Sequence, residues 1–195
     1  MIDASVTPSL TAGEVLLPAR RYLRAHGWAG NQPAMLVLGE NQTLYLFTDD
    51  QLLGQWQVST GLAGFGCREG SGCTPVGLHR VAQAIGEEAP LGAVFKGREF
   101  TGQILPQAEG AGTDLVTTRI LWLEGLQPGV NQGEGIDSKD RYIYIHGTPQ
   151  VAFLGQPVSA GCVRLAPEDV VTLYQQVGVG TLLLIWPTLA DAGEV

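Results

Sequence analysis

The chain has 195 residues, of which 45% are hydrophobic and 15% are charged. This length suits one domain, and the apolar share is large enough to form a core, so the composition excludes an intrinsically disordered protein. The formal net charge of −8, without any cluster of lysine and arginine, argues against nucleic acid as a partner.

The N-terminus reads MIDASVTPSL and lacks the basic segment and apolar stretch of a secretory signal. The longest apolar run lies near residues 182–186 and is too short to cross a bilayer. We therefore expect a cytoplasmic protein without a membrane span, or a periplasmic one if a leader has been removed.

A helix is predicted over residues 11–26, ended by Gly27. Pro18 either kinks this helix or marks its start. Residues 1–33 are then an N-terminal helical segment that precedes the main domain.

Short apolar segments follow, separated by turns in a chain that contains 27 glycines. Strands are predicted at residues 34–39, 43–48, 51–59, 78–85, 93–97, 99–105, 117–125, 141–147 and 181–187. Long polar loops are predicted at residues 60–77 and 126–140. The pattern predicts a mainly β fold, a sandwich or open barrel of short mixed strands over residues 34–187, with residues 188–195 as a tail.

The predicted strand at residues 141–147 alternates clearly between polar and apolar side chains. Tyr142, Tyr144 and His146 therefore share one face. Further on, Pro167 suits the first turn of a helix and Gly178 suits the C′ position after it.

The three cysteines cannot all pair within one chain. Cys67 and Cys73 are close enough in sequence for a small disulfide, although the reduced state is expected in the cytoplasm. Either way Cys162 remains a free thiol. A metal site formed by Cys67, Cys73 and a histidine is a weak alternative, because the C-x5-C spacing fits no common zinc pattern.

A thiol nucleophile needs a base that takes its proton. Cys162 lies 16 residues after His146 and directly follows Gly161, so the loop between them can return the thiol to the end of the strand. The helix predicted at Pro167 would favour a thiolate through its dipole. The N–H groups of Gly161 and Cys162 offer an oxyanion hole. From the spacing alone, structural roles are commoner than catalytic ones: such a cysteine is usually a small buried residue, and such a histidine usually has its hydrogen bonds made within the protein.

The segment HGTPQVAFLGQPVSAGCVRL (146–165) resembles the active-site signature of the L,D-transpeptidase catalytic domain, or YkuD, family. The similarity extends over residues 34–186. In the family a histidine usually stands two residues before the nucleophile, where this chain has Ala160, a departure that bears on acceptor and rate. The matching positions are His146-Gly147, Gly155-Gln156-Pro157, Ser159 and Gly161-Cys162-Val163-Arg164-Leu165.

The resemblance implies a cysteine enzyme that needs no metal or organic cofactor. Cys162 would attack the carbonyl at the L-centre of meso-diaminopimelate in a peptidoglycan tetrapeptide, so that D-Ala leaves and a thioester forms. His146 would act as base and acid, oriented by the backbone carbonyl of Gly147, with Gly161 and Cys162 as the oxyanion hole. Acylation by carbapenems is also implied. Substrate binding would fall to Arg164, Ser159 and Tyr144.

In the cytoplasm such an enzyme would meet soluble muropeptides, so water is the expected acceptor and the activity that of an L,D-carboxypeptidase in muropeptide recycling. One alternative is an L,D-transpeptidase that forms 3–3 cross-links in the cell wall. An alternative of another class is a non-catalytic peptidoglycan-binding module, against which the intact Cys162, His146 and Arg164 argue.

Overall fold

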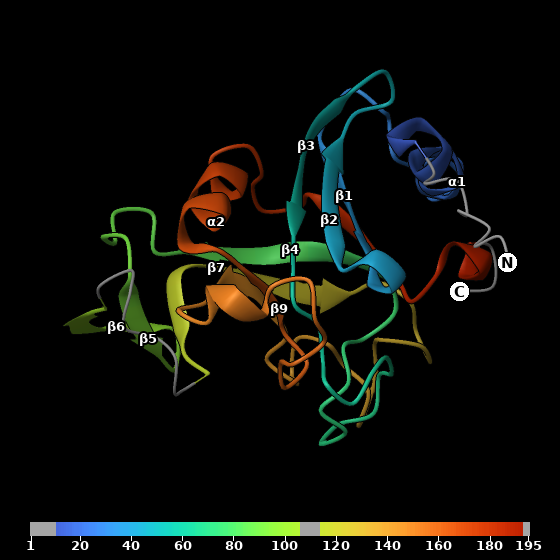
Figure 1. Ribbon diagram of the computed structural model, residues 1–195. Coiled ribbons are helices and arrows are strands. Elements are labelled where there is room, and N and C mark those ends of the chain that lie inside the picture. The colour runs from blue at the N-terminus through green and yellow to red at the C-terminus, as the bar shows by residue number, and fades with distance from the viewer. Residues whose placement is uncertain (1–10, 106–113, 193–195) are drawn as a thin grey trace, which may run out of the picture.

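The computed structural model describes residues 11–105 and 114–192. Its main feature is a ten-stranded mixed sheet that curls into a half-barrel, accompanied by two α-helices (Figure 1). The predicted mainly β fold, with one N-terminal helix and one helix after Cys162, is confirmed. In the part of the chain that is described, no helix is long and apolar enough to cross a membrane.

Every predicted strand is present, and one further short strand is added. The sheet runs in the order β3-β2-β1-β10-β4-β7-β5-β6, with β8 paired to β7 and β9 paired to β8. The pairs β1–β10 and β8–β9 are parallel and the other pairs are antiparallel. The strands are β1 (Ala34–Leu38), β2 (Thr43–Phe47), β3 (Leu52–Gln57), β4 (Gly77–Ile85), β5 (Ala93–Lys96), β6 (Glu99–Ile104), β7 (Val116–Gly125), β8 (Tyr144–Gly147), β9 (Val163–Leu165) and β10 (Leu182–Trp186).

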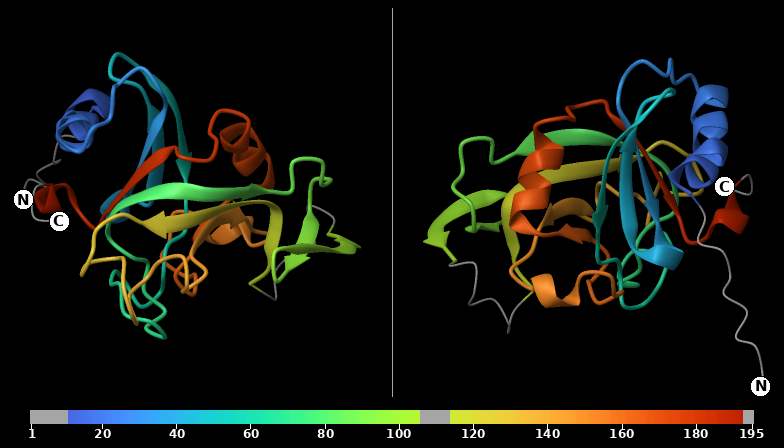
Figure 2. Two further views of the ribbon diagram at one scale, coloured as in Figure 1. Left: turned by 180° about the vertical axis from the view of Figure 1, so that it is seen from behind. Right: turned by 45° about the horizontal axis from the view of Figure 1, so that its top comes forward.

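Helix α1 (Ala12–Ala25) begins with a capping box in which Thr11 and Glu14 bond each other's backbone N–H groups. Pro18 lies inside this helix, so it does not mark the start. The buried face of α1, which includes Leu16 and Leu23, packs in one apolar cluster with side chains of β1, β2 and β10. Helix α1 therefore covers the outer face of the sheet at β1, β2 and β10 (Figure 2).

Helix α2 (Pro167–Tyr174) lies on the other side of β1–β3 from α1 and closes the concave side of the half-barrel (Figures 1 and 2). Its Val170 and Leu173 are fully buried against side chains such as Leu123 and Ile145. Burial of an aliphatic side chain of this size stabilises the fold by roughly 1.5–3 kcal/mol. The core therefore fixes the strands β7, β8 and β9 against α2.

The structure differs from the predicted elements at three places. Strand β8 begins at Tyr144 rather than at residue 141, because Tyr142 has φ of +56° and lies in a turn. The added strand is β9, whose three residues are too few to show a pattern. Helix α2 ends at Tyr174, so the prediction of Gly178 as its C′ residue is wrong; the Gly178 N–H instead bonds Thr181 Oγ1 in the turn before β10.

Candidate active site

The strands β7, β8 and β9 place the predicted nucleophile and base on one face of the sheet. In the parallel pair β8–β9, Ile145 lies opposite Val163 and His146 lies opposite Arg164. Cys162 directly precedes β9, so the same register places it beside Tyr144. Side chains alternate along a strand, and the thiol and the imidazole are therefore diagonal neighbours on the same face.

The Cys162 thiol is held by the backbone of the segment before it. Sγ accepts a hydrogen bond from Tyr144 N–H at 3.4 Å and donates to Tyr142 O at 3.6 Å. Burial raises the pKa of Cys162 to about 11, although the bond from Tyr144 N–H opposes this. The thiol is therefore protonated at neutral pH. The predicted thiolate is wrong because β9 separates Cys162 from the N-terminus of α2 and burial disfavours the charge.

The His146 imidazole is 2% exposed, and its Nδ1 lies 2.8 Å from the carbonyl oxygen of Gly147. A carbonyl only accepts, so Nδ1 carries the proton and Nε2 keeps a free lone pair. Burial lowers the pKa of His146, which keeps the ring neutral at pH 7. A Cβ at Gly147 would lie 2.8 Å from Thr117 O, so β7 and β8 approach this closely only with glycine there.

Within the described residues, the thiol makes its hydrogen bonds to backbone groups rather than to the imidazole. Transfer of the Cys162 proton to Nε2 of His146 therefore requires the S–H to turn away from Tyr142 O. Contacts of this kind commonly tighten only when substrate is bound. The arrangement supplies a neutral thiol and a neutral base on one surface.

Ser159 shapes the turn that carries the nucleophile. It is 3% exposed, and its Oγ donates to Cys162 O at 2.6 Å and accepts from Gly161 N–H at 3.1 Å. The hydroxyl of Ser159 is therefore used inside the loop, and its predicted role in substrate binding stays a prediction. Of the two N–H groups predicted to form the oxyanion hole, that of Gly161 is already bonded to Ser159, which leaves Cys162 N–H as the better placed donor.

Gly161 itself is required by the geometry of this turn. Its φ is +121°, and a Cβ there would lie 2.9 Å from Cys73 O. Its carbonyl oxygen accepts a hydrogen bond of 3.0 Å from Thr74 Oγ1. The loop at residues 60–77 therefore sets the position of the nucleophile.

Arg164 lies opposite His146 in the strand register, but its guanidinium is buried in the protein rather than open to the site. It is fully buried, with Nη1 at 2.7 Å from Asp114 Oδ1 and 2.8 Å from Gln150 Oε1, and Nη2 at 3.1 Å from Ser59 Oγ. These three partners occupy the guanidinium, and the substrate contact predicted for Arg164 stays a prediction. Arg164 thus binds the surrounding segments together beside His146, whose pKa its charge lowers further.

Tyr144 is 8% exposed and supports the nucleophile, and its predicted substrate-binding role stays a prediction. Its backbone N–H holds Cys162 Sγ, and its hydroxyl accepts a hydrogen bond of 3.2 Å from Arg98 Nη1. The Arg98 guanidinium also lies over the Trp122 ring, with Cζ 4.4 Å from its centroid. Sequence reasoning missed Arg98 and Trp122, because only the folded sheet brings them to Tyr144, which lies beside Cys162.

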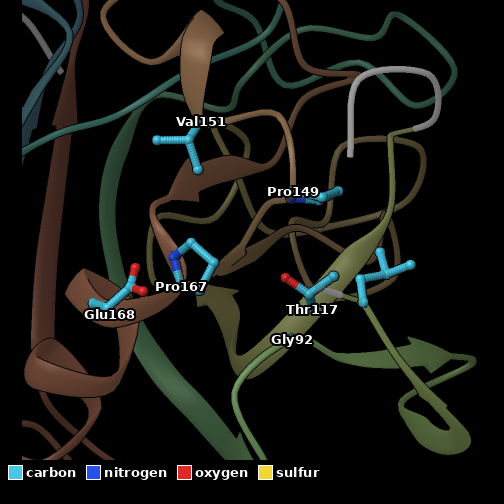
Figure 3. A pocket seen from close by; sticks show the side chains of 7 residues that line it. Gly92, Thr117, Pro149, Val151, Pro167 and Glu168 are labelled. Carbon is cyan, nitrogen blue, oxygen red and sulfur yellow. The ribbon is translucent and has the colours of Figure 1, made fainter. Parts of the chain in front are cut away.

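Two hollows flank the candidate pair. One, of about 220 Å³, lies next to the pairing of Thr117 with Gly147, and its lining includes Pro149 and Val151 opposite Pro167 (Figure 3). The other lies beside the nucleophile turn, so that Ala160 presents a methyl group to a groove whose rim is charged. This second groove is lined by Glu69, Gly70, Gly72, Asp140, Arg141, Tyr142, Ile143 and Ala160.

The cysteines Cys67, Cys73 and Cys162 are all unpaired. Over residues 11–105 and 114–192, no group of three or more His, Cys, Asp or Glu side chains is arranged to hold a metal ion.

Comparison with known proteins gives one consistent family. The family model of the L,D-transpeptidase catalytic domain (YkuD) matches residues 33–185. The "Putative L,D-transpeptidase YqjB" of Bacillus subtilis (strain 168) is 46% identical over 54 residues, which are 26% of this chain and 31% of that protein.

Solved structures of several L,D-transpeptidases match this chain at low identity. The L,D-transpeptidase from Mycobacterium smegmatis is 18% identical with a TM-score of 0.47, over 80% of this chain and 58% of that one. A mutant of the Enterococcus faecium L,D-transpeptidase is 17% identical with a TM-score of 0.49, over 80% and 50%. Mycobacterium tuberculosis L,D-transpeptidase 3 in complex with a faropenem-derived adduct is 16% identical with a TM-score of 0.45, over 78% and 59%. The chain spans 50–59% of the length of these solved chains.

Proposed function

The chain belongs to the L,D-transpeptidase catalytic domain (YkuD) family, and we propose that it is a cysteine acyl-transfer enzyme that acts on peptidoglycan stem peptides. One observation carries the proposal. The imidazole of His146, neutral and fixed by its bond to Gly147 O, shares a sheet face with the protonated thiol of Cys162. Such a thiol becomes a nucleophile only when a nearby base takes its proton.

In the proposed reaction, Nε2 of His146 takes the Cys162 proton as Sγ attacks the carbonyl carbon at the L-centre of meso-diaminopimelate. The oxygen of the tetrahedral intermediate accepts a hydrogen bond from Cys162 N–H, and from Gly161 N–H once this donor leaves Ser159. When the intermediate collapses, the C–N bond breaks and His146 returns the proton to the leaving amine of D-Ala. The thioester on Cys162 is then ready for a second nucleophile.

We propose water as this second nucleophile, which makes the enzyme an L,D-carboxypeptidase. Support comes from Ala160, which presents a methyl group to the groove beside the nucleophile where the family usually has a histidine. A methyl group offers no polar contact to hold an amine acceptor, whereas a water molecule needs no such contact and can be deprotonated by His146. A transpeptidase remains the second candidate, because Glu69 and Asp140 place carboxylates in the same groove, where they suit an ammonium group of an acceptor peptide.

The test uses the purified chain and the tetrapeptide L-Ala-γ-D-Glu-meso-diaminopimelate-D-Ala, with and without a second stem peptide as amine acceptor. Mass spectrometry should find free D-Ala and the tripeptide in both reactions, and neither product with Cys162→Ala. A 3–3 dimer as the main product would make the chain a transpeptidase. Absence of any D-Ala release and of any acyl adduct on Cys162 would overturn the proposal.

A further inference from the structure

A stem peptide that ends in D-Ala carries a carboxylate near the bond to be broken, so its recognition calls for an accessible cation. Two of the arginines near the site are already used by the protein. Arg164 is buried with its three side-chain partners. Arg141 donates to Gly66 O at 3.1 Å and to Cys73 O at 2.6 Å, and so fixes the loop at residues 60–77.

Arg98 remains, and the fold presents it to the same face as Cys162. It lies in the turn between β5 and β6, with Cζ 4.4 Å from the centroid of Trp122 and 5.3 Å from that of Tyr142. Trp122 is itself anchored by a hydrogen bond from Nε1 to Lys139 O at 3.0 Å. The guanidinium is thus held over the rings of Trp122 and Tyr142. The backbone oxygen of Tyr142 also accepts a hydrogen bond from the nucleophilic sulfur.

The hydrogen bonds of Arg98 leave most of its donors open. A guanidinium has five N–H donors, and among the described residues only Nη1 has a hydrogen-bond partner, the hydroxyl of Tyr144. The side chain is half-exposed. A planar guanidinium that is fixed from one side and open on the other matches the two oxygens of a carboxylate.

The backbone conformation at Arg98 is unfavourable for most residues other than glycine and asparagine. Gly97 and Arg98 have φ of +58° and +71°, so both central residues of the turn adopt the left-handed conformation of a type I′ hairpin. Glycine or asparagine suits the second of these positions better than arginine. The presence of arginine at this position points to a use for its side chain beyond the turn.

We propose that Arg98 binds the terminal carboxylate of the stem peptide, on the residue that leaves. The inference rests on the proposed function and names the substrate group that sets its specificity. Tyr144 connects Cys162 with Arg98, because its N–H donates a hydrogen bond to Cys162 Sγ and its hydroxyl accepts one from Arg98 Nη1. In the substrate, three covalent bonds separate the attacked carbonyl carbon from the carboxylate carbon of the leaving residue, so a peptide over Tyr144 can reach both groups.

The experiment compares the tetrapeptide with its C-terminal carboxamide, which lacks the charge but keeps the bond to be broken. Arg98→Gln should lower kcat/KM for the carboxylate peptide by roughly 10- to 100-fold, mainly through KM, because one charged hydrogen-bond pair is lost. With the carboxamide, Arg98→Gln and the wild type should differ by less than about 2-fold. Arg98→Lys should recover part of the loss, because it restores the charge without the two-pronged geometry.

Lys96→Gln serves as the matched control, since it removes an exposed cation from the same hairpin and should leave both peptides unaffected. Equal losses on the two peptides with Arg98→Gln would show that Arg98 only pins the hairpin, which overturns the inference. A carboxylate-specific loss with Lys139→Gln instead, whose Nζ lies 5.9 Å from the Trp122 centroid, would also overturn it. If the wild type released nothing from either peptide, the proposed function would fall and this inference with it.

Discussion

His146 donates its Nδ1 proton to the backbone oxygen of Gly147 across 2.8 Å, which leaves Nε2 as the lone-pair nitrogen of the ring. A backbone carbonyl here takes the part that a carboxylate plays in serine protease triads, where it orients the imidazole. Because the orienting group is neutral, it stabilises the imidazolium less than a carboxylate would. The resting state is therefore expected to be a neutral pair rather than a thiolate–imidazolium ion pair.

Covalent labelling gives the first prediction. Incubation with a carbapenem should add one inhibitor mass to the chain, located on Cys162 by peptide mapping, because a strained lactam carbonyl is a ready acyl donor for the thiol that His146 activates. Cys162→Ala should remain unlabelled. The double substitution of Cys67→Ser and Cys73→Ser should label like the wild type, and loss of labelling there would mean that one of those thiols takes part.

The second prediction concerns the base. His146→Ala should lower kcat by roughly 10²- to 10⁴-fold, the usual value of general base catalysis. The wild-type rate should stay constant as pH falls to about 6.5 and decline only below it, since burial lowers the pKa of His146 and the neutral ring is the active form.

In His146→Ala the residual rate should instead rise through the alkaline range, because the thiol must then lose its proton to solvent and burial raises the pKa of Cys162 to about 11. The pH profiles of the wild type and of His146→Ala are measured by assays of D-Ala release, run from about pH 5 to about pH 9. An unchanged pH profile in the variant would contradict the assignment of His146.

A third prediction is the pH dependence of stability, to which the fully buried His79 contributes. Its ring nitrogens lie 3.0 Å from Gly77 O and 2.9 Å from Ser138 Oγ, and burial lowers its pKa from 6.5 to about 4. The unfolded chain binds this proton more readily, so the stabilisation is complete above pH 6.5 and is lost as pH falls toward 4. The loss amounts to about 3 kcal/mol for a shift of this size.

Urea unfolding at several pH values within that window measures the slope. His79→Gln should be less stable at neutral pH but should depend less steeply on pH, by about one proton. If the variant and the wild type lose free energy of unfolding in parallel, another group is responsible.

The fourth prediction separates structure from binding at Arg164. Arg164→Lys cannot satisfy Asp114, Gln150 and Ser59 together, so it should lower the free energy of unfolding by about 1–3 kcal/mol. Thermal or urea denaturation provides the measurement, with the exposed Arg21→Lys of α1 as control. A variant of normal stability that loses affinity only for carboxylate-ended peptides would support the substrate role first predicted for Arg164.

The features that could be predicted from the sequence are those encoded by near neighbours. The helix at residues 11–26 was predictable because Gly27 ends it, and its capping pair, Thr11 and Glu14, lies within four consecutive residues. Likewise the strands follow from local alternation, and the family signature locates Cys162 and His146. The three-residue strand β9 offered too short a pattern for this kind of reasoning.

The features that could not be predicted depend on contacts between distant parts of the chain. Arg164 is buried by Asp114, 50 residues before it, and by Ser59, 105 residues before it. The bond from Arg98 to Tyr144 spans 46 residues. No local pattern tells whether an arginine next to a nucleophile points to solvent or into the sheet.

Strand β10, the last in the chain, lies near the middle of the sheet, between β1 and β4. During synthesis, β1–β3 therefore form one group of paired strands and β4–β9 form another. Each group has an unpaired edge until β10 is made. Only when residues 182–186 leave the ribosome can the two groups join. Nascent chains that stall before that point expose two unpaired sheet edges, so this protein should depend on chaperones until residues 182–186 have been made.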